Sequence, residues 1–114
     1  MIVREIVEKL CLKAVSGDEA LNRTVTGGYS ADLLSCAMAR AKTGNVWITL
    51  QAHPNIVAVA TLLDLPAVII TEGTPVSGDV IAKANEEGIA LLCTTWSTFH
   101  VVAELARLGV KAQE

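Results

Sequence analysis

Aromatic residues are scarce in this sequence, and their absence restricts what its core can be made of. Only 4% of the 114 residues are Phe, Trp or Tyr, while 52% are hydrophobic, so the apolar content is mainly Ala, Val, Leu and Ile. Small and β-branched residues suit parallel strands that are covered on both faces. The mean hydropathy of +0.47 is high for a domain of this length. We therefore expect a partner, most simply a second copy in a homodimer, to cover part of the surface.

Positive clusters and membrane-length hydrophobic runs are also lacking. The net charge is −3, and the lysines and arginines are scattered among acidic residues. Nucleic-acid binding requires a clustered positive field, so we expect no nucleic-acid partner. No apolar run reaches the roughly 18 residues that span a membrane. The N-terminus lacks the layout of a signal peptide. We expect no membrane partner and a cytoplasmic location.

The usual sequence motifs for metal binding and catalysis are missing. The three cysteines, Cys11, Cys36 and Cys93, are widely spaced and form no CxxC pair, so we expect buried, reduced thiols and no metal or other cofactor. There is no Walker-type phosphate loop, HExxH or GxSxG motif. These absences disfavour a self-sufficient kinase or hydrolase.

The first part of the chain contains two predicted helices separated by an extended segment. Ile2, Ile6 and Leu10 recur at helical spacing, and residues 22–29, rich in Thr and Val, look extended. Apolar residues then predict a helix over 33–41, with Ser30 or Asp32 as its N-cap.

From residue 46 onward, strand and helix patterns alternate. Strands are predicted at 46–50, 67–70 and 89–93, and helices at 53–63, 78–87 and 97–108. Short connections between alternating elements predict a mostly parallel sheet with right-handed crossovers. The fold class is therefore α/β, a three-layer sandwich, and the chain is a single domain over 1–114. The helix over 53–63 is apolar nearly all round, which indicates burial or an interface; we expect burial.

Three polar loops follow the three predicted strands. In a parallel α/β sheet such loops lie at the carboxyl ends of the strands, where ligands usually bind. Each also precedes a helix N-terminus, which favours an anion. We expect a small anionic or nucleotide ligand there. The candidate residues are Gln51, His53, Asn55, Thr71, Glu72, Gly73, Thr94, Thr95 and Ser97.

Several of these residues have a second interpretation. His53 precedes Pro54 and is either an acid–base or anion-binding group or the cap of the following helix, which we favour slightly. Trp96 either stacks on a ligand or forms an apolar lid. The threonines and Ser97 are also ordinary helix caps.

Two adjacent glycines, Gly27 and Gly28, are included among the candidate ligand-binding residues. They lack the Gly-Lys-Ser/Thr sequence of a phosphate loop, so a bulge or a close backbone approach is the other interpretation. Arg23 and Asp32 flank this bend and either form an ion pair across it or remain solvated.

Two segments resemble the DRTGG domain family. The first, residues 22–35, reads NRTVTGGYSADLLS, and the second, residues 46–60, reads VWITLQAHPNIVAVA. The resemblance spans nearly the whole chain, with Asn22 at the position where the family name has Asp. It implies an α/β fold similar to the N-terminal domain of HPr kinase/phosphorylase. It also implies a regulatory or assembly role, like that of the modules found beside CBS domains.

Three hypotheses about function follow. The leading one is a non-catalytic regulatory or assembly module that forms a homodimer and binds a small anion or nucleotide at the three loops. The second is a small enzyme that uses His53 as acid–base, with Glu72 and Thr94–Thr95 around it. The third is a structural subunit of a redox or kinase assembly.

Overall fold

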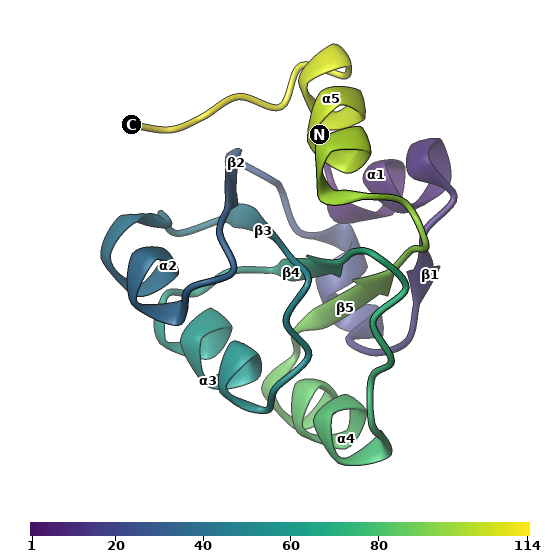
Figure 1. The fold of residues 1–114 in the computed structure, drawn as a ribbon, viewed down its shortest axis with the longest axis vertical. Coiled ribbons are helices and arrows are strands. Elements are labelled where there is room, and N and C mark those ends of the chain that lie inside the picture. Colours follow the sequence, from purple (N-terminus) through teal and green to yellow (C-terminus); the bar gives the residue numbers. More distant parts are fainter.

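The computed structural model describes residues 1–114 and is built around a five-stranded sheet (Figure 1). The strand order is β1-β5-β4-β3-β2, with β2 to β5 parallel to one another and β1 antiparallel to β5. The strands are β1 (Lys13–Ala14), β2 (Gly27–Ser30), β3 (Asn45–Thr49), β4 (Ala67–Ile70) and β5 (Ala90–Cys93).

Helices cover both faces of the sheet and complete the predicted three-layer α/β fold. The helices are α1 (Val3–Leu10), the short 3₁₀ helix η1 (Asp18–Asn22), α2 (Leu34–Arg40), α3 (Asn55–Leu62), α4 (Gly78–Glu87) and α5 (Thr98–Arg107). Helices α1 and α5 lie on one face, and α2, α3 and α4 lie on the other (Figure 1). None of these helices is both long enough and apolar enough to cross a membrane.

Alternation along the parallel strands divides the core into two clusters, one on each face of the sheet. Val46 and Ile48 of β3 pack with α1 and α5, whereas Trp47 packs with α2, α3 and α4. Successive residues of a strand point to opposite faces, so a strand covered on both sides is apolar throughout. This explains why β4, Ala67–Ile70, is buried at every position.

Most predicted elements are confirmed, but the amino-terminal third differs from expectation. The segment over 22–29 begins in η1 and becomes a strand only at Gly27, and β1 was not predicted as a strand. Neither Ser30 nor Asp32 caps α2, because Leu33 occupies its N-cap position. The expected burial of all three thiols is wrong as well. Cys11 is exposed at the C-cap of α1, and the other two cysteines are half-buried.

Helix α3 is buried along only one side. Ile56, Val57, Val59 and Ala60 are buried, as expected, but Leu62 keeps 68% of its surface exposed. An apolar groove of about 440 Å³ separates this exposed side from α2, where Leu34 and Met38 form the other wall.

Candidate functional site

The carboxyl ends of β3, β4 and β5 meet as the sequence predicts, and backbone hydrogen bonds continue past the strands. The Thr71 amide donates to the Thr49 carbonyl over 3.0 Å, and the Thr94 amide donates to the Ile70 carbonyl over 3.0 Å. The loops after β4 and β5 are therefore held side by side. Of the predicted site residues, the structure brings together Thr71, Glu72, Gly73, Thr94, Thr95 and Ser97.

Glu72 links these two loops and caps α5. Its backbone amide donates to the Trp96 carbonyl over 2.8 Å, and its Oε2 accepts from the Thr98 amide at 2.8 Å. Ser97 Oγ accepts from the His100 amide in the same helix turn. A carboxylate is thus already present at the N-terminus of α5, where helix geometry favours an anion.

The hydroxyl groups of this cluster are also engaged within the protein. Thr71 is fully buried, and its Oγ1 lies 2.6 Å from Oγ1 of Thr98. Thr94 Oγ1 accepts from the Trp96 amide over 3.1 Å. These bonds fix the loop conformation, because buried polar groups are costly to leave without a partner.

A pocket of about 410 Å³ opens beside these loops, between them and the short edge strand β1. Lys13 of β1 lines the pocket and forms none of the ion pairs in the structure. Burial raises the pKa of the neighbouring Cys93 thiol, and the positive charge of Lys13 opposes that rise. The remaining lining residues are Leu10, Cys11, Gly73, Thr74, Thr94, Thr95 and Trp96. This pocket places an unpaired lysine beside polar loops, an arrangement that favours an anionic ligand.

The loop after β3 forms a separate group around Asp32. Asp32 Oδ1 accepts from Thr49 Oγ1 at 3.0 Å and from the Leu50 amide at 2.9 Å. His53 Nδ1 accepts from the Asn55 amide, the first amide of α3, at 3.1 Å, although Pro54 and not His53 occupies the N-cap position. Gln51, His53 and Asn55 line a shallow depression with Asp32. Glu72, the residue that an acid–base mechanism would pair with His53, belongs to the other group.

Gly27 and Gly28 lie at the opposite end of the sheet from the three loops. They pair with Asn45 and Val46, the first residues of β3. A Cβ on Gly27 would lie 2.8 Å from the Lys111 carbonyl oxygen, and the Gly28 amide donates to that oxygen over 3.0 Å. The close-approach interpretation therefore fits this glycine pair, which allows the C-terminal segment to lie against β2.

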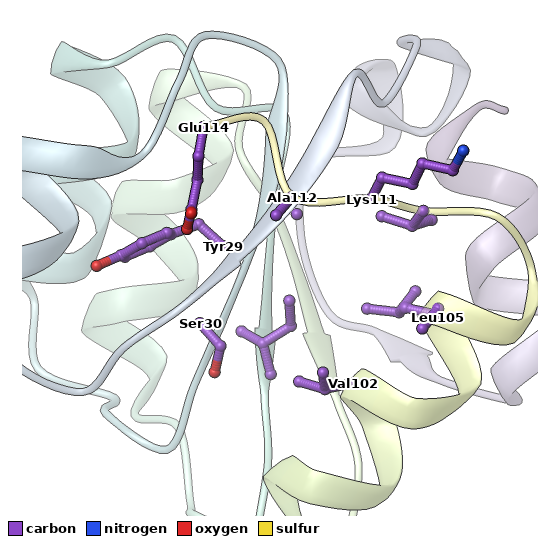
Figure 2. A pocket seen from close by; sticks show the side chains of 11 residues that line it. Tyr29, Ser30, Val102, Leu105, Lys111, Ala112 and Glu114 are labelled. Atoms are coloured by element: carbon purple, nitrogen blue, oxygen red, sulfur yellow. The ribbon is translucent and has the colours of Figure 1, made fainter.

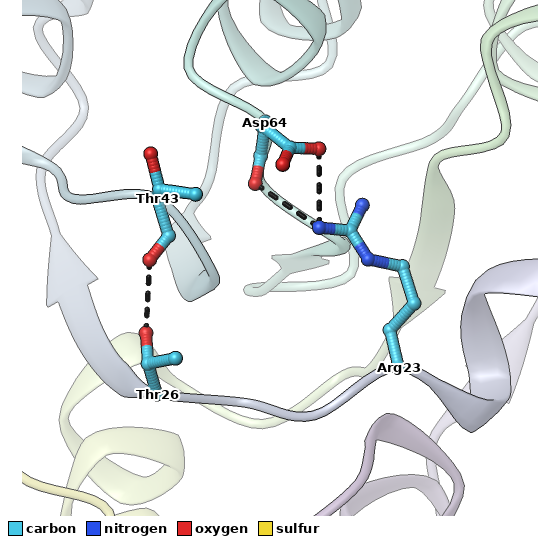
Figure 3. Close-up of polar contacts among 4 residues, drawn as sticks. All are labelled: Arg23, Thr26, Thr43 and Asp64. Atoms are coloured by element: carbon cyan, nitrogen blue, oxygen red, sulfur yellow. Dashed lines mark hydrogen bonds and ion pairs between the residues drawn. The ribbon is translucent and has the colours of Figure 1, made fainter.

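The residues before the glycine pair form polar contacts with neighbouring turns (Figure 3). Arg23 Nη2 lies 3.1 Å from Asp64 Oδ1 and donates to the Asp64 carbonyl over 3.4 Å. Of the two alternatives for Arg23 and Asp32, the ion pair between them is not formed. Thr26 Oγ1 donates to the Thr43 carbonyl over 3.0 Å. Asn22 Oδ1 accepts two bonds of 3.3 Å from Arg4.

Sequence reasoning missed two residues of the carboxyl-end groups, Lys13 and Asp32. Lys13 reaches its pocket because β1 lies at the edge of the sheet beside β5. Asp32 reaches the end of β3 because β2 lies beside β3. Only the strand order places these residues, and no local pattern encodes it.

Comparison with known proteins agrees with this architecture. The family model of the DRTGG domain matches residues 5–108. The HPr kinase/phosphorylase of Enterococcus faecalis (strain ATCC 700802 / V583) is 27% identical over an alignment that covers 91% of this chain and 39% of the relative.

A solved structure of the CBS and DRTGG domains has the same fold. It comes from the regulatory region of Clostridium perfringens pyrophosphatase, complexed with the activator diadenosine tetraphosphate. The TM-score is 0.73 at 18% identity, over 90% of this chain and 44% of that chain. The chain thus spans about two fifths of each relative. The family match extends from α1 to the end of α5, and the chain belongs to the DRTGG domain family.

Proposed function

We propose that this chain is a non-catalytic regulatory or assembly module of the cytoplasm that binds a small anionic ligand, a nucleotide, and acts as a homodimer. The observation that carries the ligand proposal is the pocket beside Lys13. The surrounding loops use their polar groups to bond one another, whereas the Lys13 ammonium has no carboxylate partner.

The pocket has the size and chemistry for part of a nucleotide. A volume of about 410 Å³ falls within the usual range for small-molecule sites. Lys13 supplies a positive charge for a phosphate, and Thr95, at the exposed loop tip, supplies a hydroxyl. Trp96 is already stacked on His100 with ring centroids 3.9 Å apart, which provides an apolar wall for a base.

The relatives support a regulatory role for a domain of this kind. One comprises the CBS and DRTGG domains of the regulatory region of a pyrophosphatase, in complex with a dinucleotide activator. The other is a kinase/phosphorylase of which this chain matches 39%. The titratable residues of these loops serve as structural partners in this chain, which supports a non-catalytic role. Glu72 caps α5, and His53 accepts from the backbone.

The homodimer is proposed from exposed apolar side chains on two surfaces. One surface lies on α2 and α3, around Met38 and Leu62. The other lies on α5, where Phe99 is 85% exposed and Val102 is also exposed. Large apolar side chains gathered on a surface in this way are typical of association sites.

A thermal-shift titration tests the ligand proposal. The probes are inorganic phosphate, sulfate, adenine and guanine nucleotides, and diadenosine tetraphosphate. A ligand that binds the native state raises the melting temperature, and the rise grows with the logarithm of the ligand concentration above the dissociation constant. We expect a dose-dependent rise with at least one nucleotide, and we expect Lys13→Gln to remove it.

Two variants locate the effect. Lys42→Gln removes the same charge at the amino end of the sheet and should keep the full response. His53→Ala tests the separate depression beside Asp32 and should also keep it. A response lost in His53→Ala but kept in Lys13→Gln would move the ligand to the loop after β3. A flat response to every probe would overturn the ligand proposal and leave the assembly role.

A further inference from the structure

Helix α3 exposes a side that carries no charged residue. Its sequence, NIVAVATL, is apolar apart from Asn55 and Thr61, yet Ala58 and Leu62 are exposed. A surface helix normally presents charged or polar residues to water, and a helix that is apolar nearly all round is normally buried. The rest of this chain buries only one side of α3, so its sequence is suited to a second contact on the other side.

The exposed side of α3 and the neighbouring α2 form one apolar surface, the α2–α3 surface. The two helices lie side by side (Figure 1), and the groove of about 440 Å³ between them is lined by uncharged residues alone. Met38 of α2 is 46% exposed and Leu62 of α3 is 68% exposed. Ser35 and Ala58, which also line the groove, are small. The surface therefore combines projecting side chains with a hollow, as packing between helices requires.

Polar and charged residues lie only at the margin of the α2–α3 surface. The polar depression around Asp32 is continuous with the groove, because three residues line both. At the other margin, Arg40 ends α2 and Asp64 follows α3, and each forms an ion pair within the chain, with Glu114 and Arg23 respectively. An apolar centre from which charges are absent, with a polar rim, is the usual anatomy of a protein–protein interface.

The other apolar surface of the chain, on α5, is interrupted by charges (Figure 2). A pocket of about 300 Å³ lies between β2 and α5, and Lys111 and Glu114 are among its lining residues. On α5 itself, Glu104 and Arg107 form an ion pair of 2.7 Å. A partner on this side would have to desolvate these charged groups, which is costly unless the partner supplies matching charges. The α2–α3 surface has no such requirement.

A second copy of the chain is the occupant that the charges favour. Each copy has a net charge of −3, so two copies repel one another wherever their charged surfaces meet. Two-fold symmetry brings the same patch of both copies together. An uncharged patch can therefore meet itself without like-charge repulsion, whereas a charged patch cannot.

We propose that the chain dimerises through α2 and α3, with the α2–α3 surface of one copy packed on that of the other around a two-fold axis. This inference rests on the homodimer of the proposed function and names its interface. Met38 and Leu62 of each copy then contact the groove of the other copy, and the four helices form a layer between the two sheets.

The size of this surface sets the expected strength of the dimer. Helices of seven and eight residues are only about 10 to 12 Å long. Two of them cover less than the roughly 800 Å² per partner of a standard interface. We therefore expect a weak dimer, with a dissociation constant on the order of 10 to 100 μM.

Sedimentation of single variants of the full chain, from about 1 to 500 μM, tests this interface. Met38→Glu places a carboxylate on the α2–α3 surface of both copies and should raise the dissociation constant about tenfold or more. Val102→Glu is the matched control. It introduces the same charge at a side chain of similar exposure, 39%, on α5, and should change the constant less than about twofold. Both side chains are exposed, so both variants should keep the melting temperature of the unchanged chain.

A mixing experiment tests whether the surface meets itself. Met38→Glu and Met38→Lys each place like charges at the contact when alone. In an equimolar mixture, unlike copies bring opposite charges together. We expect the mixture to contain at least about three times the dimer fraction of either variant alone at the same total concentration. Val102→Glu mixed with Val102→Lys should show the same dimer fraction as each variant alone.

The outcomes separate this proposal from the proposed function. A dimer that Met38→Glu weakens no more than Val102→Glu does overturns the α2–α3 interface and keeps the homodimer. A dimer that Met38→Glu weakens, but that the mixture with Met38→Lys does not restore, overturns the two-fold pairing of this surface. A chain that stays monomeric at every concentration overturns both proposals and leaves the groove to a partner other than a second copy.

Discussion

The two ends of the sheet use their polar residues for different purposes. At the carboxyl ends, the loops after β4 and β5 bond to each other through Glu72, Thr71 and Thr98, and leave Lys13 free in a pocket. At the amino end, Arg23 and Thr26 bond to neighbouring turns, and the glycine pair allows the C-terminal segment around Lys111 to lie against β2. Ligands of parallel α/β sheets bind at the carboxyl ends. In this chain the glycine pair of the signature stretch lies at the amino end of the sheet, where Gly27 and Gly28 pair with the first residues of β3 and line pockets beside Lys111.

The largest expected loss of stability comes from replacing a glycine in a left-handed conformation, and two such glycines, Gly44 and Gly73, should differ in how much they lose. Gly44, with φ +84°, would place a Cβ 2.7 Å from Thr26 Cγ2, whereas at Gly73, with φ +68°, the nearest atom is 3.9 Å away. Gly73→Ala should cost about 1 kcal/mol of unfolding free energy from backbone strain alone. Gly44→Ala should cost about 3 kcal/mol, since overpacking adds to the same strain. Urea denaturation measures both, and equal losses would mean that the turn beside Thr26 relaxes freely.

The next effect concerns the carboxylate at the N-terminus of α5. Glu72→Ala removes the acceptor of the Thr98 amide and should lower the unfolding free energy by about 1 kcal/mol, the usual value of a cap. The matched control is Glu86→Ala, which removes an exposed carboxylate whose contact is Lys83 at 4.0 Å. If the two variants were equally stable, Glu72 would contribute no capping and the α5 N-terminus would be open to a ligand.

A smaller effect tests the electrostatics of the pocket. Burial raises the pKa of Cys93, and the Lys13 charge lowers it, so Lys13→Gln should raise the pKa further. The thiolate is the reactive form, and we expect alkylation of Cys93 by iodoacetamide at pH 8 to slow about twofold. Lys42→Gln should leave the rate unchanged, as measured by mass spectrometry. An unchanged alkylation rate in Lys13→Gln would mean that the Lys13 ammonium lies too far from the Cys93 thiol to affect its pKa.

The same pKa shift predicts a pH dependence of stability. A thiol whose folded pKa is raised above its unfolded value contributes stability below the unfolded pKa, and this is lost as the pH rises through the folded pKa. Cys93→Ser should therefore flatten the alkaline decline in melting temperature relative to Cys36→Ser.

The smallest expected change in stability comes from Asn22, which stands where the family name has Asp. Asn22 Oδ1 accepts from Arg4 at 3.3 Å, so Asn22→Asp would create an exposed ion pair with Arg4. Such pairs contribute a few tenths of a kcal/mol. Asn22→Asp should stabilise the chain by about 0.5 kcal/mol in low salt, with the gain lost in 1 M NaCl. A gain that persists in high salt would contradict the electrostatic explanation.

The second half of the fold is readable from sequence because its signals are local. The predicted bounds of α4 and β4 agree with the structure, since Ser77 caps α4, and Gly88 ends it in the left-handed conformation. β1 lacks such signals. It has only two residues and exists through pairing with β5, far away in the sequence.

The candidate site is predictable only in part, for the same reason. Alternating strands and helices place the loops around Thr71 and Thr94 at one edge of the sheet. The alternation does not indicate which segment lies beside β5, so it cannot predict that Lys13 of β1 joins the site. Polarity and glycine content also do not tell one end of a strand from the other. Gly27 and Gly28 consequently entered the predicted site although they begin β2 at the far end.

The most direct test of the central claim is a titration of the ¹⁵N-labelled full chain with the nucleotide that gives the largest thermal shift, followed by amide chemical shifts. Binding in the pocket beside Lys13 predicts saturable shifts at the amides of Lys13, Gly73 and Thr95, with the amides of Arg23, Gly27 and Gly28 unmoved. Saturable shifts at the signature stretch, with no shifts in the carboxyl-end loops, would contradict binding in the pocket beside Lys13.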